Sequence, residues 1–404
     1  MHPEPASKKK VLFLPRWYPN RFDPMPGLFI RRHAVSVSEY FDVSVLSVHL
    51  NFEKGALPYE TEVCRKQGIL EVHIYTVTSK TGIKQFDSLL NLFRLFVAHY
   101  KGFGIVNKES GKPDLIHVNV LTRLGVIAML YRFMKGVPYV ITEHWTRYLP
   151  GMDNFRGWLR KLLSRLVVWH ASAVMPVTLN LQYAMERHGL ANPHYHVIPN
   201  VVDTEMFIPK EHTVDKYRKM FLHVSCFDDN QKNISGILRV LKWLSARRQD
   251  WVCSMTGEGI HYERLVKYAE ELQLKDKFVF FTGLRENHEL VELMQQACFQ
   301  VMFSRYENLP VVIPESFACG VPFVSTDVGG ISEHIHRQLG RLIPPEDEDA
   351  LLESISYMLD HYQEFDKAEI RKYALDHFSN EVIGRQIRDV YFEAFRQEAT
   401  GRKH

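Results

Sequence analysis

Residues 303–320 read FSRYENLPVVIPESFACG, a stretch in which the end of an apolar run, a polar loop and a helical segment follow one another. The run from Phe299 to Phe303 predicts a buried strand. Pro310 fits the first turn of the helix, Asn308 can cap it and Gly320 can end it. The stretch therefore predicts a strand, a loop and a helix, which is the repeating unit of parallel α/β sheets.

Two carboxylates stand in this stretch, Glu307 in the loop and Glu315 inside the predicted helix. Taken alone, each can be a solvated surface charge. Because acid and base carboxylates normally face each other across a bond, we interpret both as hydroxyl-binding groups at different points of one elongated polyol ligand. The free amides and the positive dipole end at the start of the helix are where a diphosphate would be held.

The same alternation of short apolar strands and amphipathic helices runs through the whole chain. In the first half, the predicted strands are Val11–Leu14, Val43–Val48, Val72–Val77, Leu115–Val118, Tyr139–Thr142 and Val174–Val177, and the helices include Leu28–Tyr40, Leu121–Met134 and Trp158–Val168. In the second half, the strands are Phe221–Ser225, Val252–Thr256, Phe278–Phe281, Phe299–Phe303 and Pro322–Ser325, and the helices include Ile234–Ala246, Tyr262–Leu272, Glu289–Gln296 and Pro310–Cys319.

A polar, proline-punctuated stretch from Ile198 to Pro209 suits a linker between the two halves. We therefore predict an α/β protein of two Rossmann-like domains, residues 1–200 and 201–380, that face each other across a cleft. A ligand would sit at the carboxyl ends of both sheets. Apolar residues at helical spacing from Ile383 to Phe395 predict a long C-terminal helix, residues 381–404, that packs back toward the first domain.

Composition excludes several classes of protein. The 404 residues are 46% hydrophobic, which excludes a disordered chain, and no run approaches the roughly 20 apolar residues of a membrane span. The five cysteines are far apart and have no zinc spacing, which favours a reduced cytosolic setting. No GxGxxG follows the first strand, and no Walker A, HExxH or GxSxG sequence occurs. Asp347 and Asp349 match an Asp-x-Asp metal motif, but we interpret them as the acidic first turn of a helix.

The net charge of +3 conceals a split at Asn200. The first half carries 25 basic and 14 acidic residues, or +11, and the remainder carries 25 and 33, or −8. This asymmetry predicts that the basic half faces an anionic acceptor or a membrane surface. The helix from Trp158 to Val168, with its apolar stripe and basic face, is either an interfacial helix or a cover for the sheet, and we favour the cover.

Motif spacing across most of the chain resembles glycosyltransferase family 4, a family of retaining enzymes with the two-domain GT-B fold. The resemblance rests on Glu307, seven intervening residues and Glu315, followed by Ala318, Gly320, Pro322, Asp327, Gly329, Gly330 and Glu333. Further matches are Val197–Asn200, Val202, Asp203 and Phe207 at the domain junction, Gly257 and Gly259, Phe281–Gly283, and Trp17–Pro19 with Pro26–Ile30 near the start.

The resemblance implies transfer of a sugar from a UDP- or GDP-linked donor to a saccharide or lipid-linked acceptor, in the synthesis of cell-surface polysaccharide or glycan, with no metal and no cofactor required. Glu307 would contact the donor sugar, Glu315 the ribose, and His144 the reacting sugar from the first domain. Lys232 would neutralise the diphosphate, Leu284 would hold the base through its main chain, and Gly27 would approach the phosphates. The remaining donor-site candidates are Asn308, Leu309, Pro310, Val311, Gly257 and Arg305.

Some alternatives stay open at this point. Lys232 lies in a sequence that is also typical of an ordinary turn. His117 and His170 are alternatives to His144 as the histidine that contacts the reacting sugar. Cys226 stands where the family often has an arginine, and Arg305 is a candidate to replace it. A nucleotide-sugar epimerase of the same fold, or a non-catalytic nucleotide-sugar-binding protein, is the alternative function. We expect a cytoplasmic protein that binds no nucleic acid, with peripheral contact to the inner face of an anionic membrane as an option.

Overall fold

The structure is a computed structural model that describes residues 8–400 except 54, 80, 122, 153, 212–214, 216 and 217. The outermost residues of the predicted domain ranges, 1–7 and 401–404, lie outside this description. The chain forms two compact units, each built around its own parallel sheet. The first unit comprises Met1–Val177, Gln182–Ile198 and Ile383–His404, and the second comprises Thr178–Leu181 and Pro199–Val382. The predicted α/β class is confirmed.

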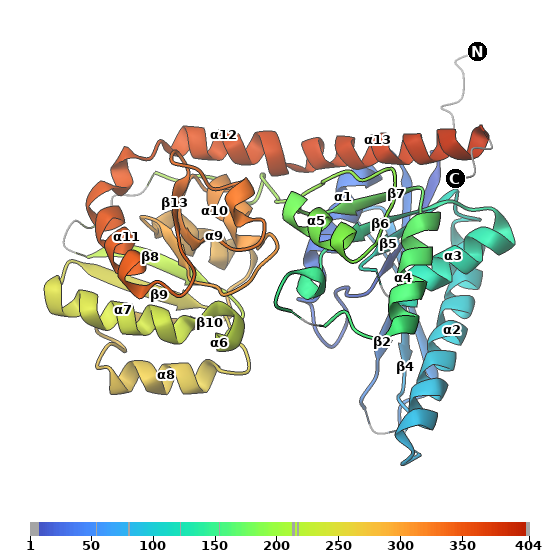
Figure 1. Cartoon of the computed structure of the whole chain (residues 1–404), viewed down its shortest axis with the longest axis horizontal. Coiled ribbons are helices and arrows are strands. Elements are labelled where there is room, and N and C mark those ends of the chain that lie inside the picture. The colour runs from blue at the N-terminus through green and yellow to red at the C-terminus, as the bar shows by residue number, and fades with distance from the viewer. Residues whose placement is uncertain are drawn as a thin grey trace. The chain divides into compact units, whose positions relative to one another are not determined.

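The first unit contains a seven-stranded sheet in the order β3-β4-β2-β1-β5-β6-β7 (Figure 1). Its strands are β1 (Lys10–Pro15), β2 (Asp42–Leu50), β3 (Tyr59–Lys66), β4 (Ile69–Thr76), β5 (Leu115–Asn119), β6 (Tyr139–Glu143) and β7 (Ala173–Pro176). All neighbours are parallel except the β3–β4 hairpin. The helices in this half of the chain are α1 (Leu28–Ser38), α2 (Lys84–Glu109), α3 (Arg123–Lys135), the 3₁₀ helix η1 (Thr146–Tyr148), α4 (Trp158–His170) and α5 (Leu179–Arg187).

Strand β3 and helix α2 are among the elements of this unit that were not predicted from the sequence. Strand β3 alternates exposed and half-exposed residues at the edge of the sheet, so it has no buried apolar run. Helix α2 leaves much of its apolar surface exposed, for example Leu89 and Phe93. Strand β3 therefore lacks the buried apolar run by which a strand is recognised. Helix α2 has buried residues only between Ala98 and Val106, in its C-terminal half.

The predicted packing of the apolar stripe of α4 against the sheet is wrong. Only Val167 and Val168 of this helix are buried, whereas Trp158 is 77% exposed. Gly125 of α3 lets Val167 approach closely, because a Cβ at Gly125 would lie 2.6 Å from the Val167 Cγ1 atom. The helix is therefore buried only at its C-terminal turn, and most of its other apolar side chains are exposed.

The long C-terminal helix α13 (Asn380–Ala399) is present. Its apolar stripe is buried in the first unit, where the Tyr391 hydroxyl lies 2.6 Å from His117 Nδ1. Gly384 allows the closest approach, since a Cβ there would lie 2.3 Å from the Ser36 carbonyl oxygen. His117, with Thr142 bonded to its other ring nitrogen, is part of this packing.

The second unit contains a six-stranded parallel sheet in the order β10-β9-β8-β11-β12-β13. Its strands are β8 (Lys219–Val224), β9 (Trp251–Thr256), β10 (Val279–Gly283), β11 (Gln300–Met302), β12 (Phe323–Thr326) and β13 (Gly340–Ile343). Its helices are α6 (Asp229–Lys232), α7 (Ile234–Arg247), α8 (Tyr262–Glu271), α9 (Asn287–Gln296), α10 (Val312–Ala318), α11 (Glu348–His361) and α12 (Lys367–Phe378), with the 3₁₀ helices η2 (Ile331–Glu333) and η3 (Tyr362–Glu364).

Each face of this second sheet has its own core. One cluster joins Phe221 and Val301 to α7, α8 and α11, and the other joins Leu222 and Met302 to α9, α10 and α12. Successive residues of one strand enter opposite clusters because side chains alternate across a strand. Helices cover both faces, so the carboxyl ends of the strands are left as the place where loops can form a ligand site.

Asp347 caps α11, as its acidic sequence predicted, by accepting a hydrogen bond from the Ala350 amide at 2.9 Å. The interpretation of Asp347 and Asp349 as the start of a helix is therefore confirmed. Among the residues that the structure describes, none of the helices combines the length and apolarity that a membrane crossing requires.

Candidate functional site

The carboxyl edge of the second sheet carries most of the donor-site residues proposed from the sequence. Lys232 follows β8, Gly257 follows β9, Leu284 follows β10 and Glu307 follows β11. Because these strands are parallel neighbours, their following loops share one edge of the sheet. A backbone hydrogen bond joins two of these loops, because the Gly257 amide after β9 donates to the Gly283 carbonyl at the end of β10 at 2.9 Å.

Lys232 and Glu307 form a buried ion pair at this edge. Lys232 Nζ donates to Glu307 Oε1, and the two side chains are only 9% and 7% exposed. Burial alone would lower the pKa of Lys232, but the adjacent Glu307 carboxylate raises the pKa above its ordinary value. The lysine is therefore held as a cation in a place where water is largely excluded, and its field is little screened.

The short helix α6 presents Lys232. The Asp228 side chain accepts a hydrogen bond from the Asn230 amide at the start of α6, and Asn233 ends it in the left-handed conformation with φ 49°. Asp229, the first residue of α6, is buried, and its Oδ1 atom accepts a hydrogen bond from the Ser235 amide at 2.8 Å. The Asp-Asn-Gln-Lys-Asn sequence therefore forms a short, capped helical turn, and this turn positions Lys232.

Arg305 is bonded into the same loop. Its guanidinium donates to the Asp229 carbonyl at 2.6 Å and to Asn233 Oδ1 at 2.8 Å, and it forms an ion pair with Glu346. These partners make Arg305 a residue that holds the α6 loop. Its role as a second phosphate cation stays a prediction.

The backbone at Glu307 is positioned by close approach from Gly329. Gly329 has φ +62°, and a Cβ there would lie 1.7 Å from the Glu307 carbonyl oxygen. The Gly330 amide donates to the Asn308 carbonyl at 3.0 Å, and Asn200 Nδ2 donates to the Leu309 carbonyl at 3.0 Å. The loop that carries the glutamate is therefore fixed by its main chain.

Helix α10 is shorter than the sequence predicted. It begins at Val312 and follows Val311, which makes no side-chain capping bond, so the expected capping role of Asn308 and the place of Pro310 in the first turn are wrong. Glu315 lies inside α10 and is buried, like Asn308 and Leu309 in the preceding loop. The helix stops where Gly320 takes φ +70°.

Gly257 and Leu284 lie on the neighbouring loops. Gly257 has φ +135°, and a Cβ there would lie 1.9 Å from the Ser225 carbonyl oxygen, so this close approach needs glycine. Leu284 is exposed directly after β10, with its backbone at the sheet edge.

In the first unit, the structure brings Gly27 and His144 to the carboxyl edge of the other sheet. His144 follows β6, and its ring lies 4.6 Å from the Phe29 ring and 5.6 Å from the His33 ring of α1. Gly27 precedes α1 with φ +73°, and a Cβ there would lie 2.1 Å from the Trp17 carbonyl oxygen. His170, by contrast, lies at the end of α4, and His117 is buried under α13.

Glu143 is a residue of this region that the sequence did not single out. It is fully buried, and its Oε1 atom accepts from the amides of His144 and Trp145 at 2.9 Å, while Oε2 accepts from the Leu121 amide at 2.8 Å. Burial raises the pKa of Glu143. The carboxyl group fixes the turn that presents His144, but a single sequence cannot distinguish such a glutamate from a surface charge.

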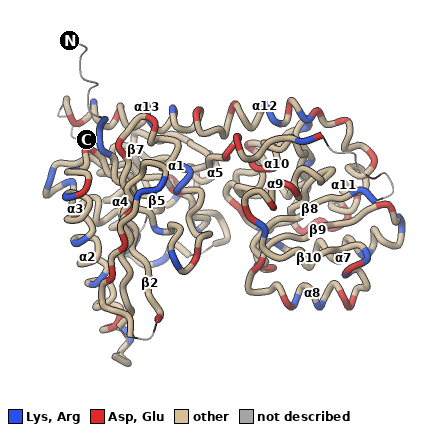
Figure 2. Tube along the Cα trace, turned by 180° about the vertical axis from the view of Figure 1, so that it is seen from behind, with Lys and Arg blue, Asp and Glu red and all other residues tan. Residues whose placement is uncertain are grey.

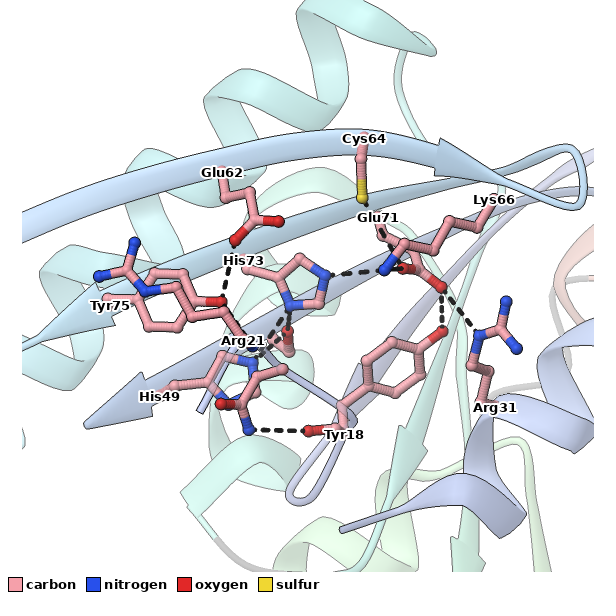
Figure 3. A network of polar contacts seen from close by, with 12 residues as sticks. Tyr18, Arg21, Arg31, His49, Glu62, Cys64, Lys66, Glu71, His73 and Tyr75 are labelled. Atoms are coloured by element: carbon pink, nitrogen blue, oxygen red, sulfur yellow. Dashed lines mark hydrogen bonds and ion pairs between the residues drawn. The ribbon is translucent and has the colours of Figure 1, made fainter. Parts of the chain in front are cut away.

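A second buried polar network anchors the loop before α1 (Figure 3). Glu71 of β4 accepts from the Tyr18 hydroxyl at 2.8 Å and from Arg31 Nε at 3.3 Å. Burial alone would raise the pKa of Glu71, but its hydrogen bonds with His73 and Tyr18 and the charge of Arg31 lower it to about 2. Within the described residues, Cys64, Glu71 and His73 form a group that is close enough to hold a metal ion. The cations already paired with Glu71 make this group a structural anchor.

Comparisons with known proteins match two family models to this chain. The model described as "Glycosyl transferases group 1" matches residues 205–375, and the model described as "Glycosyl transferase 4-like domain" matches residues 55–201. The first of these matches lies in the second unit, and the second lies mostly in the first unit.

A glycosyltransferase and a synthase are similar to this chain in sequence, and a solved structure is similar to it in fold. The N-acetyl-alpha-D-glucosaminyl L-malate synthase of Bacillus anthracis is 24% identical over 308 residues, which is 72% of this chain and 77% of that protein. The lipopolysaccharide 1,6-galactosyltransferase of Escherichia coli is 24% identical over 177 residues, 43% of this chain and 48% of that protein. The structure of Anabaena HepE in complex with UDP has a TM-score of 0.70 at 17% identity and covers 95% of this chain and 99% of that chain.

Proposed function

The chain belongs to the group 1 family of glycosyltransferases, and from this premise we propose that it moves a sugar from a nucleotide-diphosphate donor to a saccharide or lipid-linked acceptor in cell-surface glycan synthesis. The transfer retains the anomeric configuration. The observation that carries the proposal is the buried Lys232–Glu307 pair at the carboxyl edge of the second sheet. The named relatives are transferases or synthases, which does not favour the epimerase alternative.

The chemistry of this pair suits departure of a nucleoside diphosphate. Negative charge develops on the leaving diphosphate, and a lysine that is already desolvated and charged stabilises it without reorganisation. Glu307, beside the lysine, accepts hydrogen bonds from the hydroxyls of the donor sugar, and Glu315 accepts them from the ribose. The main chain of residues 308–311 lies between the two glutamates, next to the sugar and phosphates.

The remaining donor contacts follow from the neighbouring loops. Gly257 allows close approach of the nucleotide, and the main chain at Leu284 binds the base. In the first unit, His144 and Gly27 keep the roles that the family resemblance implies, toward the reacting sugar and the phosphates, and both roles stay predictions. We propose UDP or GDP as the nucleotide, and the UDP complex of Anabaena HepE supports the first of these.

A panel of nucleotide sugars tests the proposal through thermal stability, because a ligand at 100 times its dissociation constant stabilises the folded state by about 2.7 kcal/mol. We expect one UDP- or GDP-linked sugar to raise the melting temperature of the wild type at millimolar concentration. The rise should be lost in Lys232→Met and kept in Lys242→Met, which removes an exposed lysine of the same unit. Absence of stabilisation by every nucleotide sugar would contradict the proposed function.

We further propose that the enzyme works at the cytoplasmic face of a membrane, to which it binds peripherally. Helix α4 supports this, because its exposed apolar side chains Trp158, Leu159 and Leu162 are interspersed along the helix with Arg160, Lys161 and Arg165. Figure 2 marks the positions of Lys and Arg along the chain trace. Exposed apolar and basic side chains on one helix suit the boundary of an anionic bilayer.

The neighbouring helices extend this surface. A hollow of about 720 Å³ lies between α2 and α3, and apolar side chains such as Phe96, Tyr100 and Met134 line it, together with Lys101 and Lys135. Such a hollow beside an amphipathic helix can take an acyl chain while its lysines meet lipid phosphates.

Flotation with vesicles of phosphatidylglycerol or of phosphatidylcholine tests the membrane contact. We expect the wild type to float with the anionic vesicles only. Substitution of both Trp158 and Trp169 of α4 by Ser should abolish flotation, whereas Trp243→Ser, at an exposed tryptophan of α7, should leave it unchanged. Equal flotation of the double variant would remove α4 from the contact.

A further inference from the structure

Two guanidinium groups of the first unit lie against one indole ring. The Arg147 Cζ atom lies 3.1 Å and the Arg16 Cζ atom 4.5 Å from the centroid of the Trp145 ring. Trp17 packs edge-on against Trp145, with ring centroids 5.4 Å apart. Arg16 directly follows β1, and Trp145 and Arg147 follow β6, so the cluster lies at the carboxyl edge of the sheet, next to His144.

The cluster has little negative charge to balance it. Glu143 is the carboxylate whose charge acts on both arginines, but it is fully buried and accepts hydrogen bonds from three backbone amides. In the described part of the chain, the buried Nε atom of Arg147 has no hydrogen-bond partner. A guanidinium with a buried, unused donor is costly unless a ligand completes it.

Further positive charge surrounds the pair. Burial and the charge of Arg123 lower the pKa of Arg16, and burial, Arg160 and Arg16 lower the pKa of Arg147. Arginine nevertheless stays protonated in proteins, so the repulsion between these groups persists. An anion placed between them would relieve both the repulsion and the unmet hydrogen bond.

We propose that Arg16 and Arg147 bind an oxyanion of the acceptor, either a phosphate or a carboxylate, at the carboxyl edge of the first sheet. This proposal rests on the proposed transferase function and specifies the chemical class of its acceptor. Planar guanidinium groups donate paired hydrogen bonds that match phosphate and carboxylate oxygens. Stacking on Trp145 holds both groups in place before the ligand arrives, which reduces the entropy lost on binding.

Direct binding of small probes to the full-length protein tests the site. The charged probes are octyl phosphate, which represents a lipid phosphate, and glucuronic acid, which represents an acidic sugar. Octyl glucoside and glucose are their uncharged matches. The variants are Arg16→Gln and Arg147→Gln, with Arg65→Gln on β3 as a control that removes an exposed arginine of the same unit. Stabilisation of each variant by the nucleoside diphosphate reports the fold and the donor site separately.

We expect at least one charged probe to bind and its uncharged match not to bind. Each site variant should weaken that binding about tenfold or more, the usual effect of losing a charge-assisted hydrogen bond. Arg65→Gln should bind as the wild type does, and the nucleoside diphosphate should still stabilise all variants. Binding of octyl phosphate alone identifies a lipid phosphate as the source of the anion, and binding of glucuronic acid alone identifies an acidic sugar.

Two results would overturn the proposal while leaving the transferase function intact. In the first, the nucleoside diphosphate stabilises the protein but neither charged probe binds. In the second, the site variants lose melting temperature yet bind the probes as tightly as the wild type, which would make the arginines a structural support for Trp145. Failure of the nucleoside diphosphate as well would instead contradict the proposed function.

Discussion

Lys232→Met is the substitution whose effect on stability the structure defines most closely. Methionine keeps the length of the side chain but removes the charge, and it leaves Glu307 as a carboxylate that is 7% exposed and has lost its cation. Removing one partner of a buried ion pair costs about 3–5 kcal/mol. For a unit of about 150–250 residues, 1 kcal/mol shifts the melting temperature by roughly 2–4 °C, so we expect the transition of the second unit to fall by at least about 6 °C.

Scanning calorimetry on four proteins measures this effect. They are the wild type, Lys232→Met, Glu307→Gln and the double variant. A fifth protein, Lys242→Met, is the control for loss of an exposed lysine. The double variant should be more stable than the sum of the single losses predicts, because neither charge is then left buried alone. A loss in Lys232→Met no larger than in Lys242→Met would show that the pair is neither buried nor coupled, and the reasoning about the site would be refuted.

Three further predictions follow from single contacts. Glu71→Gln should remove an acid-dependent part of the stability of the first unit. Because the pKa of this carboxyl group is lowered to about 2, it contributes roughly 3 kcal/mol above pH 5, and this contribution is lost as the pH falls toward 2. Melting curves of the wild type and the variant across that pH range test this. Gly329→Ala should cost about 2–5 kcal/mol, because its Cβ would meet the Glu307 carbonyl oxygen, whereas Gly283→Ala, at φ +68° in open space, should cost about 1–2 kcal/mol in the same melting assay. Glu143→Gln should lower kcat with little change in nucleotide stabilisation, because an amide donor would face backbone donors in the turn after β6; an unchanged kcat would remove its positioning role.

Most strands of the two sheets could be predicted from the sequence because they are short apolar runs, whereas the edge strands β3 and β13 were not predicted. Val11–Leu14 and Val252–Thr256, for example, fall within β1 and β9. The exposed apolar surfaces of α2 and α4 could not be predicted from the sequence. Periodicity shows that a helix has an apolar face but not whether the rest of the protein covers that face. In α4 the apolar stripe is largely exposed, which reverses the interpretation drawn from the sequence.

The proximity of Glu307 and Lys232 could be inferred only through the family resemblance, since the two residues are 75 positions apart. The roles of Glu143 and of the arginines around Trp145 could not be predicted from the sequence for a different reason. Their importance depends on burial and on which charges meet across strands β1 and β6, and neither property is visible in a local pattern. For Asn308 the sequence predicted a role that the structure does not show. Asparagine is suited to capping a helix, but Asn308 lies four positions before α10 begins.

The anomeric configuration of the product is the most direct test of retaining sugar transfer by this protein. The protein would be incubated with the nucleotide sugar that stabilises it and with an acceptor, and the new glycosidic bond would be examined by NMR. We expect release of the nucleoside diphosphate, a product with the same anomeric configuration as the donor, and loss of both in Glu307→Ala. An inverted product, an altered nucleotide sugar without a glycoside, or full activity in Glu307→Ala would contradict it.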